Sequence, residues 1–120
     1  MKEESKLFRQ GVAAFNARRF YDAHEYWEEI WLNYKLSDTK CIQGLIQLAV
    51  SFFHYHNGNP KGAKSMAAKC IKKFEGHSEF RGILVSELLS GIKQYQSFLD
   101  NDKKYNNINS YYITLKAIHE

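Results

Sequence analysis

The sequence lacks the features of a membrane-spanning or exported protein. No apolar run approaches the roughly 18 residues that a membrane-spanning helix needs. Residues 1–6 are charged, and no apolar signal-peptide region follows them. The two cysteines, Cys41 and Cys70, form no Cys-x-x-Cys pair and stand among apolar residues, which predicts buried, reduced thiols. These absences predict a cytoplasmic protein with no membrane partner.

Proline and β-hairpin patterns are scarce as well. Pro60 is the single proline, so no helix predicted below is interrupted by one, and no run has the alternation typical of a hairpin. The chain has 120 residues, of which 44% are hydrophobic and 25% charged, enough for one hydrophobic core. The predicted fold class is therefore all-α, a single-domain bundle of five or six helices.

Apolar residues that recur with a period near 3.6 predict where these helices lie. The first two are expected at residues 3–17 and 20–34, and a third follows an N-cap at Ser37 or Asp38. The fourth and fifth helices carry buried stripes that end at about Phe74 and Leu99, and the fifth stripe includes Phe80 and Leu84. The bundle domain is thus assigned to residues 1–100. Residues 101–120 are predicted to hold a loop and then either a short helix or an extended carboxyl-terminal arm.

The third predicted helix is the most apolar segment of the chain. It has no charged residue from Cys41 to Tyr55, which predicts a place in the middle of the bundle. It ends at Gly58-Asn59-Pro60, a C-terminal glycine followed by an N-cap and a first-turn proline. Similar turns after Phe15-Asn16 and after His56-Asn57 suggest two tetratricopeptide-like helical hairpins.

Polar residues interrupt the apolar faces of the second and third helices. His24 and Glu28 are four residues apart, so they lie on one face of the second helix. Gln43, Gln47 and His54, at spacings of four and seven, form a stripe on the third. If the two stripes face each other, these five side chains form a polar site between the helices.

Three interpretations of this site stand open. The favoured one is a hydrogen-bond network that fixes helix register. The second is a zinc site with His24, Glu28 and His54 as ligands, a set that suits a metal-dependent hydrolase. The complete His-Glu-x-x-His motif is absent, because position 28 is glutamate. The third is a pocket for a small molecule or peptide, walled by Trp27 and Trp31. No cofactor other than a divalent metal such as zinc is indicated.

The charge distribution and the aromatic residues near the carboxyl terminus bear on possible partners. The net charge of +4 comes largely from lysines between positions 61 and 73, which a solvated helix face explains. They are not interleaved with aromatic residues, so nucleic acid is not favoured. A helical interaction module, or a homo-oligomer, would instead use an exposed patch such as Tyr111, Tyr112 and Ile113.

Two longer motifs carry a family resemblance. These are Phe15-Asn16 with the segment from Phe20 to Trp31, and Gln43-Gly44-Leu45-Ile46-Gln47 with His54 and Gly58-Asn59. Over residues 5–99 the chain resembles domain-of-unknown-function family 309. The resemblance implies a small helical protein with no established activity, although some members are labelled predicted metal-dependent hydrolases. One departure is Arg18, which stands where the family commonly has glycine and so argues against a left-handed helix end there.

Overall fold

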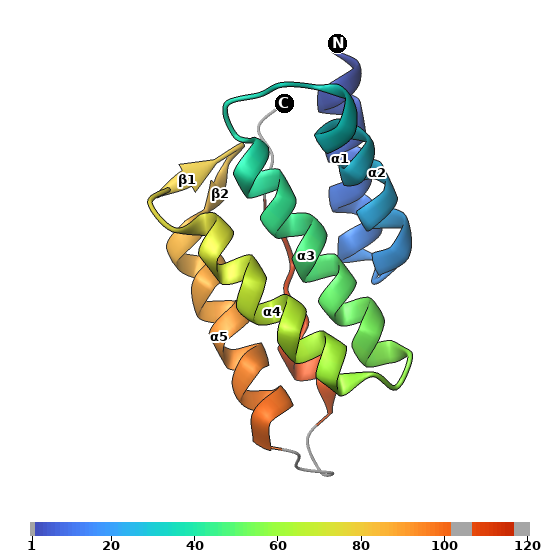
Figure 1. Ribbon diagram of the computed structural model, residues 1–120, viewed down its shortest axis with the longest axis vertical. Helices are drawn as coiled ribbons and strands as arrows, with labels where there is room; N and C mark the ends of the chain where they lie inside the picture. The colour runs from blue at the N-terminus through green and yellow to red at the C-terminus, as the bar shows by residue number, and fades with distance from the viewer. Residues whose placement is uncertain (1, 102–106, 117–120) are drawn as a thin grey trace.

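The computed structural model describes residues 2–101 and 107–116, and these form five α-helices, one short β-hairpin and one 3₁₀ turn (Figure 1). In chain order the elements are α1 (Glu3–Asn16), α2 (Phe20–Asn33), α3 (Thr39–His56), α4 (Pro60–Phe74), β1 (Glu79–Phe80), β2 (Ile83–Leu84), α5 (Val85–Asn101) and η1 (Ile108–Tyr111). The predicted all-α class is confirmed. Parts of the predicted loop and arm, 102–106 and 117–120, lie outside the described residues.

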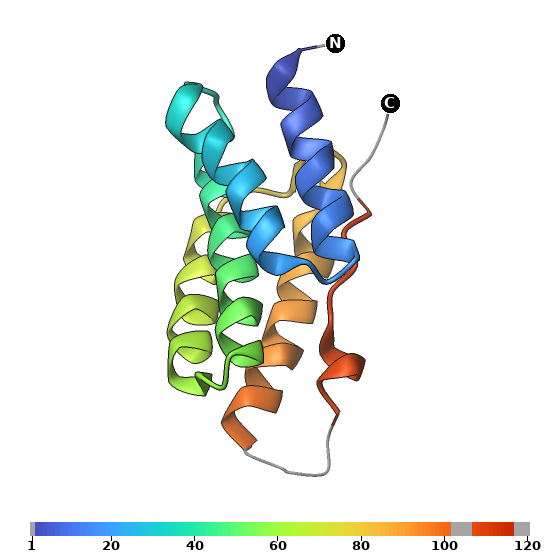
Figure 2. The same cartoon turned by 90° about the vertical axis from the view of Figure 1, so that its right-hand side faces the viewer.

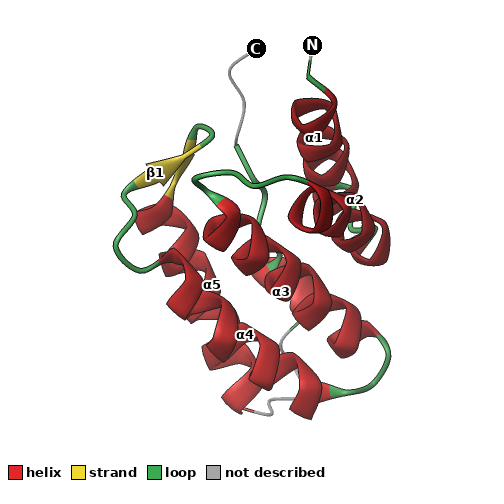
Figure 3. Ribbon diagram, turned by 45° about the horizontal axis from the view of Figure 1, so that its top comes forward, coloured by secondary structure: helices red, strands yellow, loops and turns green. Residues whose placement is uncertain are grey.

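The helices pack in the order in which they occur in the chain. α1 and α2 form one antiparallel hairpin, α3 and α4 form a second, and α5 packs on α4 (Figures 1 and 3). α3 lies between α2 and α4, as its uncharged sequence predicted. Among the described residues, no helix is both long and apolar enough to cross a membrane.

The core around α3 contains a small polar group that the sequence did not reveal. Ser51 is fully buried and donates a hydrogen bond to the carbonyl of Ala63 on α4 at 2.6 Å. Its oxygen lies 2.8 Å from the hydroxyl of Tyr95 on α5, and because the Ser51 proton is already used, Tyr95 is the donor. Burial raises the pKa of Tyr95, so this hydroxyl keeps its proton. Three helices are thereby joined by satisfied polar groups.

Both cysteines lie in this core as free thiols, as predicted. Burial raises the pKa of Cys70 to about 12, so its thiol stays protonated at neutral pH.

Two helix boundaries depend on specific backbone conformations. Asn59 caps α4 by accepting a hydrogen bond from the Gly62 amide at 3.0 Å, as predicted. At the end of α1, Arg18 adopts a φ of 66°, and the amides of Arg18 and Arg19 bond back to Phe15 and Ala14. This is a left-handed Schellman end, so the expectation drawn from the missing glycine was wrong.

The fold differs from the prediction between residues 79 and 84. Phe80 and Leu84 were assigned to the fifth helix, but they lie in β1 and β2, which pair antiparallel, and α5 begins only at Val85. The two residues between the strands, Arg81 and Gly82, have φ values of 49° and 83°. Positive φ at both central residues is the type I′ geometry that suits a two-residue hairpin.

The Arg81 side chain joins this hairpin to two helices. Its Nε donates to Oδ2 of Asp38 at 2.7 Å, at the amino end of α3. Its Nη1 lies 2.9 Å from Oε2 of Glu4 on α1, and the guanidinium stands 4.8 Å from the centre of the Phe8 ring. The Glu4 contact is a charge pair whose alignment falls short of a hydrogen bond. Burial lowers the pKa of Arg81, but the contacts with the carboxylates of Asp38 and Glu4 raise it by more, so the net shift is upward.

After η1, residues 112–116 run as an extended arm along the bundle (Figure 2). The arm lies beside α5 and the carboxyl-terminal end of α1, with the side chain of Leu115 buried. Of the two conformations considered for this segment, the structure shows the extended one over these residues.

Candidate functional site

The first predicted polar stripe lies on the edge of α2 that faces α3. His24 Nε2 is 3.6 Å from Oε2 of Glu28, one turn later on the same helix. The other ring nitrogen, Nδ1, lies 3.3 Å from the Tyr21 carbonyl. The His24 side chain is 20% exposed and that of Glu28 46%, so the pair is open to solvent on one side. An exposed pair within one helix adds little stability.

The second stripe lies on the outer face of α3. Gln43, Gln47 and His54 are each partly buried. The Gln47 Oε1 atom is buried but accepts no hydrogen bond from any of the described residues. The ring of His54 packs toward α4, where a side chain at Gly62 would come within 3.1 Å of its Cδ2. His54 therefore uses the space left by a glycine, on the side of α3 away from α2.

The two stripes do not meet in the structure. Tyr21 stacks near His24 at 5.4 Å between ring centres and near Phe53 of α3 at 5.4 Å, so two aromatic rings fill the contact. Within residues 2–101 and 107–116, no side-chain hydrogen bond joins the stripes. The His24–Glu28 pair, confined to one helix, gives no register between helices.

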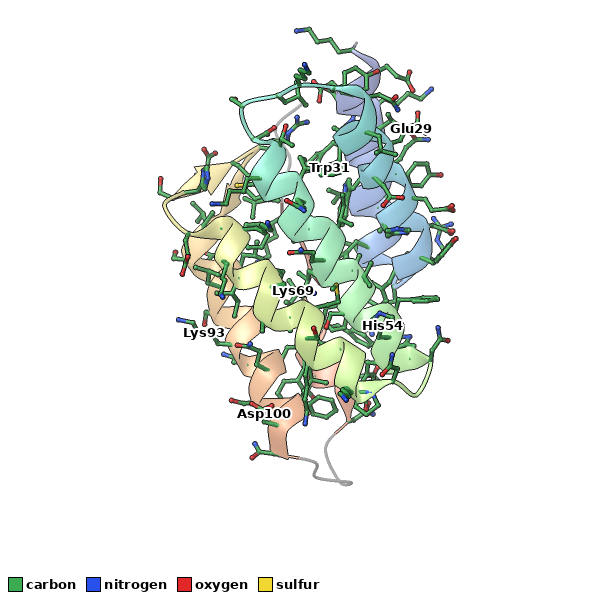
Figure 4. The ribbon with its side chains drawn as sticks, viewed as in Figure 1. Glu29, Trp31, His54, Lys69, Lys93 and Asp100 are labelled. Carbon is green, nitrogen blue, oxygen red and sulfur yellow. The ribbon has the colours of Figure 1, made fainter. Side chains whose placement is uncertain are left out.

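The donor atoms also do not fit a zinc centre. In the described part of the chain, no three His, Cys, Asp or Glu residues are grouped so that they could hold a metal ion. His24 and Glu28 are close to each other, but His54 does not complete a set with them. Figure 4 shows His54 near the carboxyl end of α3. Zinc binding by the three residues stays a prediction.

The two tryptophans have different environments. Trp27 is fully buried and its Nε1 donates to the Phe8 carbonyl at 3.2 Å, so it belongs to the core and cannot wall an open pocket. Trp31, the other predicted pocket wall, is 40% exposed. Figure 4 shows it on α2 beside the first half of α3.

The exposed edge of α2 combines apolar and acidic side chains. Tyr21 is 50% and Leu32 67% exposed, in addition to Trp31. From its first to its last residue the helix has no lysine or arginine. It carries four acidic residues, namely Asp22, Glu25, Glu28 and Glu29. Sequence reasoning did not single out Tyr21 and Leu32, because their helical phase places them outside the apolar face of α2 and a single apolar residue there carries no further signal.

Fold and site together define a class, a small all-α protein of consecutive helical hairpins with an acidic, aromatic helix edge. Residues 8–66 match the family described as Domain of unknown function (DUF309), which confirms the predicted resemblance over this segment. The matched range runs from α1 into α4 and contains all five residues of the predicted polar site.

A curated relative adds a second comparison. An uncharacterized protein of Aquifex aeolicus (strain VF5) is 30% identical over 96 residues, which are 78% of this chain and 29% of the relative. The chain therefore spans less than a third of that relative's length.

Proposed function

We propose that this chain is a binding module that docks a basic, amphipathic protein segment along the exposed edge of α2. The observation that carries the proposal is the set of exposed apolar side chains there. Among the described residues, four large hydrophobic side chains are exposed, and three of them, Tyr21, Trp31 and Leu32, are on α2. Exposed apolar groups gathered on one element indicate an interaction site.

The positions of these side chains match a linear partner. At 100° per residue, Tyr21, Glu28, Trp31 and Leu32 fall within one arc of about 100°. The row extends over twelve residues, from Tyr21 to Leu32, or about 16 Å of helix. Tryptophan and tyrosine are also the residues that most often dominate binding energy at interfaces.

Charge defines the partner further. Glu28, the acidic residue nearest the middle of the row, is 46% exposed and its neighbour His24 is neutral unless protonated. Asp22, Glu25 and Glu29 lie close by, and although Arg19 pairs with Asp22, α2 itself carries no lysine or arginine, so the helix attracts positive charge. The partner we propose therefore carries apolar side chains toward the row and lysine or arginine around them. The match to less than a third of a longer relative supports a module role.

Binding of a designed peptide tests this proposal. The probe is a 14-residue amphipathic peptide with leucines at helical spacing and lysines elsewhere, followed by fluorescence anisotropy. We expect saturable binding that weakens as salt rises, because the charges are exposed. Trp31→Ala should weaken it about tenfold or more, the effect of losing one dominant contact.

Two controls make the test specific. Leu84→Ser removes an apolar side chain that is 50% exposed on β2 and should leave the affinity unchanged. A peptide with glutamate in place of lysine should bind far more weakly. The proposal fails if the lysine peptide does not bind, or if Trp31→Ala and Leu84→Ser bind it equally.

The alternative function is a metal-dependent hydrolase with zinc held by His24, Glu28 and His54. Because the described residues offer only a pair of these donors, we expect far less than one zinc per chain in protein purified without chelator or affinity tag. Elemental analysis of the wild type and of His24→Ala measures this. One zinc per chain that His24→Ala removes would favour the hydrolase over the binding module.

A further inference from the structure

The extended arm, residues 112–116, occupies a second surface, on the side of the bundle lined by α1, α3 and α5 (Figure 2). It adjoins the exposed edge of α2 at the amino end of that helix, where Phe20 contacts the arm and Tyr21 borders the same pocket as Arg18 and His56. The arm and the η1 turn before it contact the end of α1 and the turn after it, the first residue of α2, the last part of α3 and the carboxyl-terminal part of α5. Three kinds of contact hold this segment, and each has a feature typical of peptide recognition.

The first contact is a pair of hydrogen bonds to the backbone of the arm. Asn16 donates from Nδ2 to the carbonyl of Leu115 at 3.1 Å, and its Oδ1 accepts from the Leu115 amide at 2.8 Å. One side-chain amide thus pairs with both polar backbone groups of a single residue, as a neighbouring β-strand would. Such pairing holds any extended segment, whatever its sequence, and binding of extended peptides relies on main-chain bonds of this kind.

The second contact is an aromatic site for residue 112. The Tyr112 ring lies 5.8 Å from Phe20, 5.6 Å from Phe52 and 5.6 Å from His56, measured between ring centres. The guanidinium carbon of Arg18 lies 4.0 Å from the centre of the Tyr112 ring, and the Tyr112 hydroxyl is hydrogen-bonded to Nε2 of His56. Burial lowers the pKa of His56, with Arg18 adding to the effect, and burial raises that of Tyr112. Both groups therefore stay neutral at pH 7.

Arg18 holds this position at a cost. Its left-handed backbone conformation is unfavourable for any residue other than glycine. Its side chain stacks on Tyr112 and reaches Oδ1 of Asn109 at 3.5 Å. A glycine would suit the backbone better but would leave this side of the site open.

The third contact is apolar. Leu115 is 4% exposed, and Ile113 lies against Gly91 of α5, where an added side-chain carbon would meet it at 3.3 Å. Beside residues 113–116 an open cleft of about 400 Å³ remains, bordered by β2 and the first turn of α5. The surface is therefore wider than the segment that lies on it.

From these contacts we infer that the surface lined by α1, α3 and α5 is a binding site for extended protein segments of the pattern aromatic-x-x-leucine, which the chain's own arm occupies in cis. A partner segment of this pattern binds when it displaces the arm. Asn16 recognises the backbone, Arg18 and His56 recognise the aromatic residue, and the buried Leu115 position recognises the leucine.

The test uses the full chain with its arm weakened by Tyr112→Ala and Leu115→Ala together. The probe is a fluorescent synthetic peptide with the sequence of residues 107–116, Asn-Ile-Asn-Ser-Tyr-Tyr-Ile-Thr-Leu-Lys. We expect the peptide to bind the double variant saturably and the wild type at least tenfold more weakly. The tethered wild-type arm competes at an effective concentration that reaches about millimolar for short linkers.

Two further variants separate the contacts. A peptide with alanine at the positions of Tyr112 and Leu115 should lose at least tenfold in affinity. Asn16→Ala, added to the double variant, should weaken the unmodified peptide about tenfold, because two hydrogen bonds are lost.

The inference is overturned if the peptide does not bind a double variant that is folded by circular dichroism, or binds the wild type equally well. If the double variant is unfolded, Leu115→Ala alone takes its place. Absence of peptide binding to that variant overturns the inference in the same way. The lysine peptide proposed for α2 should not compete with this peptide, which keeps the two sites distinguishable.

Discussion

Gly11→Ala is expected to lower the free energy of unfolding by about 3 kcal/mol, since overpacking a rigid core costs this much. A side-chain carbon at this position would stand 2.1 Å from Nε1 of Trp27 and 2.5 Å from two further ring atoms. The ring cannot retreat, because it is fully buried between Phe8 and Phe15 and bonded to the Phe8 carbonyl. The helices α1 and α2 would have to move apart. Urea denaturation followed by circular dichroism measures the loss.

Gly91→Ala is the matched control, since it is also a glycine inside a helix. Its added carbon would meet only Ile113, at 3.3 Å and beyond. The gain in helix propensity, about 1 kcal/mol, should offset this contact. Equal losses for Gly11→Ala and Gly91→Ala would contradict the close packing of α1 on Trp27.

Arg81→Ala is expected to cost about 2 to 3 kcal/mol, somewhat less than the loss of one partner from a fully buried ion pair. The side chains of Arg81, Glu4 and Asp38 are mostly buried, so removing the cation leaves two carboxylates facing each other without compensation. Alanine shares the cost of the positive φ, and the measured difference therefore reports the side chain. Arg81→Lys should recover only part of the loss, because an ammonium cannot bridge Asp38 with two nitrogens as the guanidinium does.

Arg19→Ala provides the comparison with an exposed pair. Arg19 lies 3.3 Å from Asp22, but both side chains are about half exposed, and the expected loss is below about 1 kcal/mol. Thermal or urea unfolding of Arg81→Ala, Arg81→Lys and Arg19→Ala measures these losses of stability. A loss for Arg81→Ala as small as that for Arg19→Ala would show that the hairpin does not depend on this network.

The helices were predictable because their signals are local. Apolar spacing located all five, and the glycine, asparagine and proline at 58–60 marked the boundary of α4 correctly. The uncharged run of α3 gave its central position. The hairpin at 79–84 was missed because each strand has only two residues and because arginine, not asparagine or aspartate, takes the first left-handed position.

The candidate site was harder to predict, because helical phase gives the face of a residue and not its neighbour. His24 and Glu28 were correctly paired on one face, but nothing in their spacing revealed that the rings of Tyr21 and Phe53 would fill the contact between α2 and α3. Likewise Asn16 and Leu115 are 99 positions apart, and no local pattern links them. The periodicity of apolar residues cannot predict contacts between residues that are far apart in the chain.

That same separation has a kinetic meaning. The helices make their main contacts with neighbours in the chain, and such local contacts form quickly. The hydrogen bond between Asn16 and Leu115 closes almost the whole polypeptide into a loop, which costs conformational entropy. The contacts of the arm offset this cost only after the helices that line its surface have packed together. The bundle should therefore form first, with the surface for the arm exposed for a time, and docking of the arm should be the last step of folding.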